Sequence, residues 1–153
     1  MSIKITLSSY TSKDKEWLSK LLVEQDVRRF LPHLTTDVDK FICDMKIAES
    51  KGLGKFWIIR LDNIGIGFIS IYDLIENPFI FYAMSPEFRN NGYMHNAIEL
   101  IEKEHSSILS TIVDVKNVRS LRILANTTIM TQKIMKDNIT NQLIHTSFND
   151  TIQ

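Results

Sequence analysis

The stretch FIFYAMSPEFRNNGYMHNAIELIEKE, residues 79–104, decides the fold of this chain. Its first six residues, Phe79 to Met84, are apolar or aromatic, which predicts a β-strand with at least one buried face. Pro86 ends that strand, because proline lacks an N–H and disfavours helical angles at the residue before it. A helix should follow, because apolar residues recur at the spacing of one helical face at Met94, Ala97, Ile98 and Ile101.

The loop between this strand and this helix has the composition of an anion-binding site. It reads Arg89-Asn90-Asn91-Gly92. The first turn of a helix carries unpaired N–H groups and a partial positive charge, so a glycine loop before it can hold a phosphate. We expect Arg89 to add a full positive charge beside that position.

This arrangement resembles the pyrophosphate-binding loop of the GNAT acetyltransferase superfamily. The family pattern is Arg or Gln, two residues, Gly, one residue, then Gly or Ala. Arg89 and Gly92 match, whereas Met94 stands where the small residue is expected. Asn90 and Asn91 replace a glycine and a basic residue that are common there. These substitutions keep the backbone N–H groups, so the resemblance still implies that acetyl-CoA binds here.

Length and composition indicate one domain. The chain has 153 residues and 44% hydrophobic content, so we expect residues 1–153 to form a single GNAT-like domain. Eighteen basic residues balance eighteen acidic ones, and without a dense basic tract nucleic acid is not an expected partner. No apolar run approaches the ~20 residues that cross a bilayer. We therefore expect a cytoplasmic protein without membrane contacts.

Metal chemistry is not indicated either. Cys43 is the only cysteine, which excludes an internal disulfide and a cysteine-rich metal site. The histidines at positions 33, 95, 105 and 145 show no metal-ligand spacing. We expect no metal.

The remaining elements follow from periodicity and turn residues. We expect strands at 3–7, 56–61, 64–72, 111–115, 129–135 and 142–148. Helices are expected through 17–22 after caps at 11–14, from about 36 to 50, and just after 117. Together with residues 79–104, this is the element order of the GNAT fold. That fold is α+β, with a mixed, mostly antiparallel central sheet of about six to seven strands flanked by about four helices. The resemblance therefore covers nearly the whole chain.

A second signature lies at Asn117, with Ser120 three residues later. It resembles the Asn-x-x-Ser of the GNAT branch that contains the RimJ/RimL-like ribosomal-protein N-terminal acetyltransferases. An amide such as Asn117 can hold a pantetheine amide, and the Ser120 hydroxyl can meet the coenzyme sulfur. Either side chain can instead cap the following helix. Val27–Pro32, with His33 after it, is similar to the segment that lines the acceptor side in that branch, although its arginines can equally form a solvated helix end.

The resemblance implies transfer of the acetyl group of acetyl-CoA to a primary amine, either a peptide N-terminus or a small amine. In this family a backbone N–H polarises the thioester carbonyl where the fourth strand splays, which maps onto Met84. The hydroxyl of Ser120 is the second catalytic group. The residues implied in coenzyme binding are Tyr82, Ala83, Met84, Arg89, Asn90, Asn91, Gly92, Tyr93, Met94, Asn117 and Ser120.

The proton acceptor is not defined by a motif. Glu24, Asp73 and Glu76 are candidates by location, and each can equally be a solvated carboxylate. Many GNAT enzymes carry a tyrosine acid seven residues after the asparagine, where this chain has Leu124. A thiol with a pKa of ~8.5 leaves as a thiolate with little help, and Ser120 can donate in place of the tyrosine.

Two functions remain open from the sequence. One is an active N-acetyltransferase, and the other is a catalytically impaired GNAT-fold module that binds CoA, or nothing, and serves in regulation or interaction. The matching loop and Asn117 with Ser120 favour the enzyme, whereas Met94 and the undefined base favour the module. Exposed strand edges also allow a homodimer, which the sequence does not decide.

Overall fold

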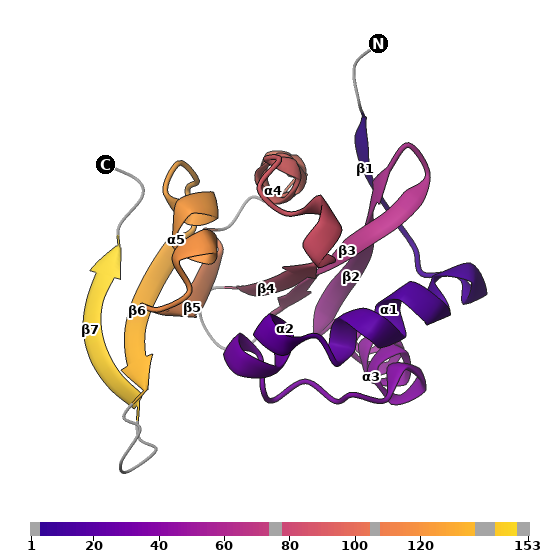
Figure 1. Ribbon diagram of the computed structural model, residues 1–153, viewed down its shortest axis with the longest axis horizontal. Helices are drawn as coiled ribbons and strands as arrows, with labels where there is room; N and C mark the ends of the chain where they lie inside the picture. Colours follow the sequence, from indigo (N-terminus) through magenta and orange to yellow (C-terminus); the bar gives the residue numbers. More distant parts are fainter. Residues whose placement is uncertain (1–3, 74–77, 105–107, 137–142, 150–153) are drawn as a thin grey trace.

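The computed structural model describes residues 4–73, 78–104, 108–136 and 143–149. These residues form a seven-stranded sheet in which the strands lie in chain order from β1 to β7, with helices on both faces (Figure 1). The strands are β1 Ile5–Ser8, β2 Gly54–Leu61, β3 Ile64–Tyr72, β4 Phe79–Met84, β5 Ser110–Asp114, β6 Met130–Lys136 and β7 Leu143–Asn149. The helices are α1 Lys15–Leu22, α2 Gln25–Phe30, α3 Val38–Ser50, α4 Tyr93–Glu104 and α5 Val118–Leu124, with short 3-10 turns η1 Ser12–Asp14 and η2 Pro86–Phe88.

The sheet is mixed, as the sequence predicts. Neighbours from β1 to β4 pair antiparallel, as do β6 and β7. The two parallel pairs are β4 with β5 and β5 with β6, because α4 and α5 are crossover helices that return the chain to the same edge. The α+β fold class is therefore confirmed. The sequence also predicts a turn at Asp137 and Asn138, which lie outside the described residues.

One helix was not predicted. The segment Gln25–Phe30 forms α2, although its six residues are too few to show helical periodicity. Glu24 caps it, because its side chain accepts the N–H of Asp26 at 2.9 Å. Val27 anchors the helix in the core at 3% exposure. A short helix of this kind depends on its cap and its tertiary contacts rather than on propensity.

Two hydrophobic clusters fill the two faces of the sheet. Phe41, Phe68 and Phe81 belong to the cluster on the side of α1–α3, and Ile80 and Ile98 belong to the cluster on the side of α4 and α5. Alternate residues of a strand point to opposite faces, so β4 contributes to both clusters. Figure 1 shows the same division, with α4 and α5 on one side of the sheet and α1–α3 on the other. None of the helices in the described residues is both long and apolar enough to cross a bilayer.

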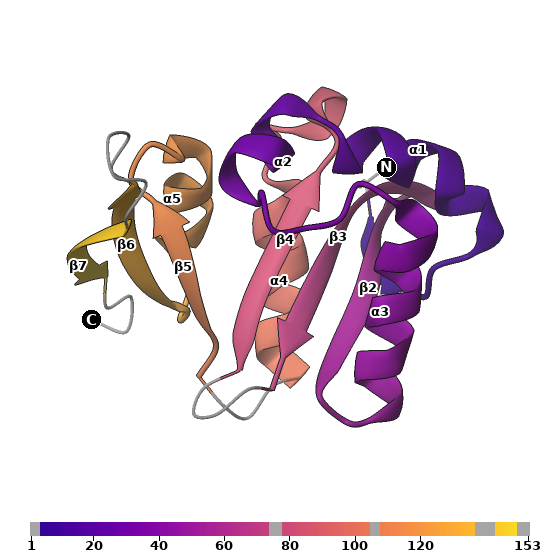
Figure 2. The same cartoon turned by 90° about the horizontal axis from the view of Figure 1, so that it is seen from below.

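The sheet opens between β4 and β5. Within the described chain, the parallel pairing of these two strands consists of one residue pair, Phe79 with Ser110. The strands then diverge, and α2 lies at the wide end of the opening (Figure 2). The opening brings residues from both faces of the sheet to one place.

A buried ion pair fixes the N-terminal segment to the sheet. Asp14 is 2% exposed, and its carboxylate accepts two hydrogen bonds from Arg60 of β2, at 2.9 and 2.8 Å. It also accepts the indole N–H of Trp17 and the backbone N–H of Thr11, both at 2.9 Å. Burial alone would raise the pKa of Asp14, but these hydrogen bonds outweigh it and lower the pKa to about 2 from its ordinary 3.8. The ionised carboxylate therefore stabilises the fold above pH ~4, and this contribution is lost as the pH falls towards 2.

We expect Asp14→Asn to lower the free energy of unfolding by about 2 to 4 kcal/mol at pH 7, because Arg60 loses its charged partner. The difference from wild type should shrink near pH 2, where the wild-type carboxylate itself becomes protonated. Urea unfolding at both pH values measures it. Asp39→Asn is the control, because Asp39 pairs with Lys15 at the surface and should change stability by under about 1 kcal/mol. An Asp14→Asn effect that stayed constant with pH would contradict a role for the charge.

Candidate functional site

A cavity of about 900 Å³ lies where β4 and β5 separate. Phe30, Leu31 and Phe81 line it from the α1–α3 side of the sheet. Tyr82 and Met94 line it from the side of α4 and α5. The cavity is therefore lined by side chains from both faces of the sheet.

The edge of β4 that faces this cavity carries backbone hydrogen-bonding groups. The carbonyl of Pro78 accepts the N–H of Ser110 at 2.8 Å, and the carbonyl of Ile80 accepts the Thr111 hydroxyl at 2.8 Å. Backbone groups of successive residues point to opposite edges of a strand. The groups of Tyr82 and Met84 therefore point to the β5 side as well, where the strands have separated.

Ala83, which the resemblance implies in coenzyme binding, does not direct its backbone groups into the cavity. Its backbone groups point to β3, where it pairs with Phe68, so it faces the cavity with its side chain. The contact with β3 is close, because a Cβ placed on Gly67 would lie 2.5 Å from the Ala83 carbonyl oxygen. Glycine at position 67 therefore lets β3 approach β4 beside the site.

The loop after β4 presents N–H groups at the start of α4. The Gly92 carbonyl accepts the N–H of Asn96 at 3.0 Å, so Gly92 is the N-cap residue, and it has no side chain to cover the next N–H groups. Asn90 and Gly92 both have positive φ, 66° and 78°, a conformation that asparagine and glycine tolerate best. Met94 is 4% exposed and packs into the core. Its side chain is therefore directed into the core, where it also lines the cavity.

The charge of Arg89 is used inside the protein. Its side chain is 10% exposed, and Nε donates to the Met84 carbonyl at 2.8 Å. The guanidinium pairs with Glu24 and lies 3.4 Å from the carboxylate of Asp26. This differs from the expectation of a free positive charge beside the phosphate. Arg89 instead holds the loop against the end of β4 and the start of α2.

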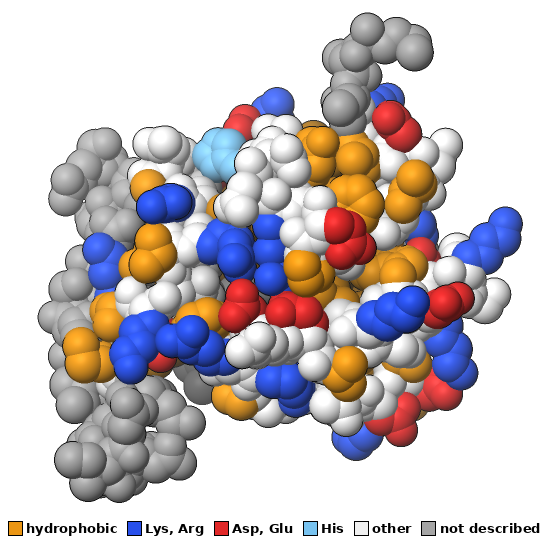
Figure 3. All heavy atoms as spheres, viewed as in Figure 1, with side chains coloured by type: hydrophobic (Ala, Val, Ile, Leu, Met, Phe, Trp, Pro, Cys, Tyr) orange, Lys and Arg blue, Asp and Glu red, His pale blue; other side chains and the backbone are white. Residues whose placement is uncertain are grey.

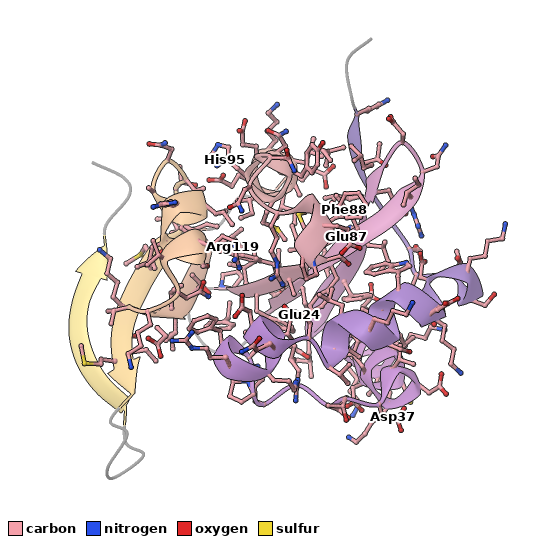
Figure 4. The ribbon with its side chains drawn as sticks, viewed as in Figure 1. Glu24, Asp37, Glu87, Phe88, His95 and Arg119 are labelled. Carbon is pink, nitrogen blue, oxygen red and sulfur yellow. The ribbon has the colours of Figure 1, made fainter. Side chains whose placement is uncertain are left out.

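Asp26 extends this network across the opening. Its carboxylate also lies 3.4 Å from a guanidinium nitrogen of Arg119 on α5. Figure 3 shows the basic and acidic side chains gathered on this face between α2 and α5, and Figure 4 shows Glu24 and Arg119 on either side of the gap. We call Glu24, Asp26, Arg89 and Arg119 the bridging cluster, because it joins α2 to α5 and to the loop.

Two of the three carboxylates proposed as a base, Glu24 and Asp73, are not placed to act as one. Burial would raise the pKa of Glu24, but the Asp26 N–H and the Arg89 side chain outweigh it and lower the pKa, so Glu24 is ionised and paired. Asp73 is exposed, and neither Glu24 nor Asp73 is among the described residues that line the cavity. Glu76 lies outside the described residues.

His33 is the group that sequence reasoning passed over. It lines the cavity on the α2 side, with its ring edge-on to Phe81 at a centroid distance of 6.2 Å. Burial and the nearby charge of Arg28 lower the pKa of His33, so the imidazole is neutral at pH 7 and can accept a proton. The available signal was its place at the end of the segment that the resemblance assigned to the acceptor side.

The arginines of that segment have separate roles. Arg28 donates to the carbonyls of Leu31 and Leu34, at 3.4 and 2.8 Å, and so fixes the backbone before His33. Arg29 is exposed, with its guanidinium 4.8 Å from the centre of the Phe30 ring, and lines the cavity. Arg28 is therefore not a solvated helix end.

Asn117 and Ser120 divide the two roles that the sequence left open. The Asn117 side-chain oxygen accepts the Ser120 N–H at 3.3 Å and caps α5. The Ser120 hydroxyl does not serve as a cap but lies 2.5 Å from the Tyr82 hydroxyl. Leu124 is fully buried, so the position at which many relatives carry a tyrosine acid belongs here to the core.

His95 joins the two helices beside the cavity. One ring nitrogen lies 3.2 Å from the Ile123 carbonyl on α5, and the other lies 2.8 Å from Glu99 one turn later on α4 (Figure 4). Within the described residues, no group of three or more His, Cys, Asp or Glu side chains could hold a metal ion.

Comparison with known proteins gives a family match. The sequence profile of the acetyltransferase (GNAT) domain matches residues 4–127. No curated protein sequence matches the chain.

Solved acetyltransferase structures have a similar fold. A GNAT-family acetyltransferase from Bacillus anthracis has a TM-score of 0.72 at 21% identity, covering 92% of this chain and 90% of that one. The ribosomal-protein α-N-acetyltransferase RimL in complex with coenzyme A has a TM-score of 0.69 at 17% identity, covering 97% and 92%. RimJ of Mycobacterium smegmatis in complex with CoA-disulfide has a TM-score of 0.67 at 14% identity, covering 86% and 73%. At these identities the likeness concerns the fold.

The bridging cluster gives a stability prediction. We expect Arg89→Met to lower the free energy of unfolding by about 3 to 5 kcal/mol, because the Glu24 carboxylate is left without its cationic partner. Arg89→Met combined with Glu24→Leu should recover part of this loss, since the unpaired charge is removed. Urea unfolding of the two single variants and the double variant measures the coupling.

The control for these three variants is the surface pair Glu16 and Lys20, whose side chains are both largely exposed. Lys20→Met should change stability by under about 0.5 kcal/mol. Strictly additive effects of Arg89→Met and Glu24→Leu would contradict the assignment of Arg89 to the interior pair.

Proposed function

The chain belongs to the GNAT acetyltransferase family, and from that premise we propose that it transfers the acetyl group of acetyl-CoA to the primary amine of a peptide N-terminus or a small molecule. The observation that carries this proposal is the open edge of β4, which ends beside the uncapped N–H groups of α4. A strand edge and a helix N-terminus in this order suit a ligand with amides at one end and a diphosphate further along.

Acetyl-CoA would lie on the α4 and α5 side of the opening. The N–H groups at the start of α4 would hold the diphosphate, and the backbone groups of Tyr82 would pair with the pantetheine arm in place of β5. The Asn117 amide nitrogen remains a donor for that arm, because its oxygen caps α5. Arg119 and Arg122 line the same cavity and would add positive charge around the phosphates.

The acceptor would enter from the opposite face, between α2 and β4. Its amine nitrogen attacks the thioester carbonyl, an N–C bond forms, and the C–S bond breaks with the electron pair on sulfur. The N–H of Met84 points into the opening and would donate to the oxyanion, an interaction worth roughly 2.7 to 4 kcal/mol in such sites. Neutral His33 would take the proton from the ammonium before attack or from the nitrogen after it.

A peptide N-terminus is the preferred acceptor. Two of the structures with a similar fold are RimJ and RimL, and the latter is named as a protein α-N-acetyltransferase. The acceptor wall of this chain combines the apolar Phe30, Leu31 and Phe81 with one exposed cation, Arg29. Such a wall suits the side chains that follow a peptide N-terminus.

The second candidate is a GNAT-fold module that binds CoA without turnover. The observation in its favour is that two carboxylates lining the cavity, Asp26 and Asp114, already have partners. Asp26 lines the cavity but lies between two arginines, and Asp114 accepts the N–H of Lys116 at 2.8 Å. Transfer would then depend on His33 for the proton, and without that step the protein would only hold the coenzyme.

The coenzyme site is tested by Gly92→Asp, which places a carboxylate at the start of α4 and should weaken CoA binding at least about tenfold by repulsion of the diphosphate. Gly92→Asn is the matched control, since it has the same size and the same cost of positive φ without the charge. Space is not limiting for either, because a Cβ at this position meets no atom within 4 Å. Calorimetric titration with CoA measures both. Equal affinities of the two variants would contradict binding of the diphosphate at this loop.

Transfer is tested by incubating the protein with acetyl-CoA and a set of peptides with free N-termini, alongside small alkylamines. We expect a mass increase of one acetyl group on a peptide, matched by release of CoA thiol. His33→Asn should slow transfer by about 10²- to 10⁴-fold, the usual contribution of a positioned base, with little change in CoA affinity. CoA binding without transfer to any acceptor of the set would support the binding module.

A further inference from the structure

The Tyr82 and Ser120 hydroxyls form a pair inside the cavity that joins β4 to α5. Their oxygens lie 2.5 Å apart, and both residues line the cavity. Ser120 is 8% exposed. Tyr82 lies on the strand that loses its neighbour, and Ser120 lies in the first turn of the helix on the other side of the opening. The pair therefore stands where the thioester end of acetyl-CoA must pass.

The geometry points to Tyr82 as a positioning residue, whose phenol donates to the Ser120 oxygen and so turns the Ser120 hydrogen towards the sulfur of the coenzyme. This inference rests on the proposed function, because it requires CoA in the cavity. It gives a role to the Tyr82 hydroxyl, whereas the resemblance implies only that Tyr82 takes part in binding the coenzyme.

The direction of the hydrogen bond follows from the chemistry of the two groups. A phenol is more acidic than an aliphatic alcohol, so it is the stronger donor of the pair. Burial raises the pKa of Tyr82, with the Ser120 hydrogen bond acting the other way, so the phenol keeps its proton over the working pH range. Ser120 has a single hydroxyl hydrogen and two lone pairs. When one lone pair accepts from Tyr82, that hydrogen remains for the sulfur.

The two hydrogen bonds, from Tyr82 to Ser120 and from Ser120 to the sulfur, stabilise the leaving thiolate. When the C–S bond breaks, the sulfur takes the electron pair and accepts a hydrogen bond from Ser120. The proton stays on the Ser120 oxygen, because a thiolate with a conjugate-acid pKa of ~8.5 is a far weaker base than an alkoxide. Consecutive hydrogen bonds strengthen one another by about 10 to 30% each, so loss of the Tyr82 hydroxyl should weaken the bond to sulfur as well as misdirect it.

The test measures the thiol of bound CoA, which requires no acceptor. The ultraviolet absorbance of the thiolate is followed against pH in the CoA complex, and the complex with desulfo-CoA, which lacks the thiol, supplies the baseline. We expect the bound thiol to titrate near pH ~7.5, about tenfold more acidic than an ordinary thiol at ~8.5. Tyr82→Phe should return the thiol at least halfway to ~8.5, and Ser120→Ala should return it fully.

Two controls separate positioning from damage to the site. The affinity for desulfo-CoA should stay within about twofold of wild type in Tyr82→Phe, since that ligand has no sulfur to meet. Tyr72→Phe removes another hydroxyl of the sheet, one that lies 3.7 Å from the Met45 sulfur and is not among the described lining residues. It should leave the bound thiol unchanged.

The inference is overturned if the thiol titration is the same in wild type and Tyr82→Phe. It is also overturned if Tyr82→Phe has an effect and Ser120→Ala has none, because the phenol would then act on the sulfur directly. A wild-type protein that binds neither CoA nor desulfo-CoA would overturn the proposed function, whereas one that binds both with an unshifted thiol would overturn only this inference.

Discussion

The whole site depends on the loss of pairing between β4 and β5. A sheet normally satisfies the backbone groups of each inner strand from both sides, yet in the described chain these two strands pair at Phe79 and Ser110 and then separate. The N–H and carbonyl groups of Tyr82, together with the N–H of Met84, are consequently directed into a cavity. Such an edge is costly unless water or a ligand satisfies it. A fold that retains this edge is suited to a ligand with amides.

Separated strands would close or fray unless other contacts held them, and the bridging cluster supplies those contacts. Arg89 joins the end of β4 to Glu24, and Asp26 lies between Arg89 and Arg119. The charges are close to balanced, since two carboxylates meet two guanidinium groups. Arg89 and Glu24 are 10% and 17% exposed, so their attraction is stronger than that of a surface pair, whereas Arg119 and Asp26 are 38% and 32% exposed. The cluster therefore sets the position of α2 relative to the loop and to α5.

Local features of the sequence predicted most of the fold. The strand, loop and helix of residues 79–104 are each determined by neighbours within a few positions, and their predicted bounds agree with β4 and α4. The features that were missed depend on distant partners. Arg89 meets a carboxylate 65 residues away in the chain, Tyr82 meets a hydroxyl 38 residues away, and α2 depends on packing and one cap. No short-range pattern encodes such contacts. The sequence analysis therefore placed the charge of Arg89 beside a phosphate, whereas in the structure Arg89 pairs with Glu24.

Helix α5 carries no tyrosine acid, but the strand β4 carries Tyr82. Leu124 is fully buried in the cluster on the side of α4 and α5 and is not among the described residues that line the cavity. Tyr82 approaches the same region from the strand, and its hydroxyl meets Ser120. Tyr82 is held by its pairing with Ile69 of β3, so the sheet positions its phenol beside the open edge. The chain can therefore lack the helix-borne tyrosine and still place a phenol where it acts on the leaving sulfur through Ser120.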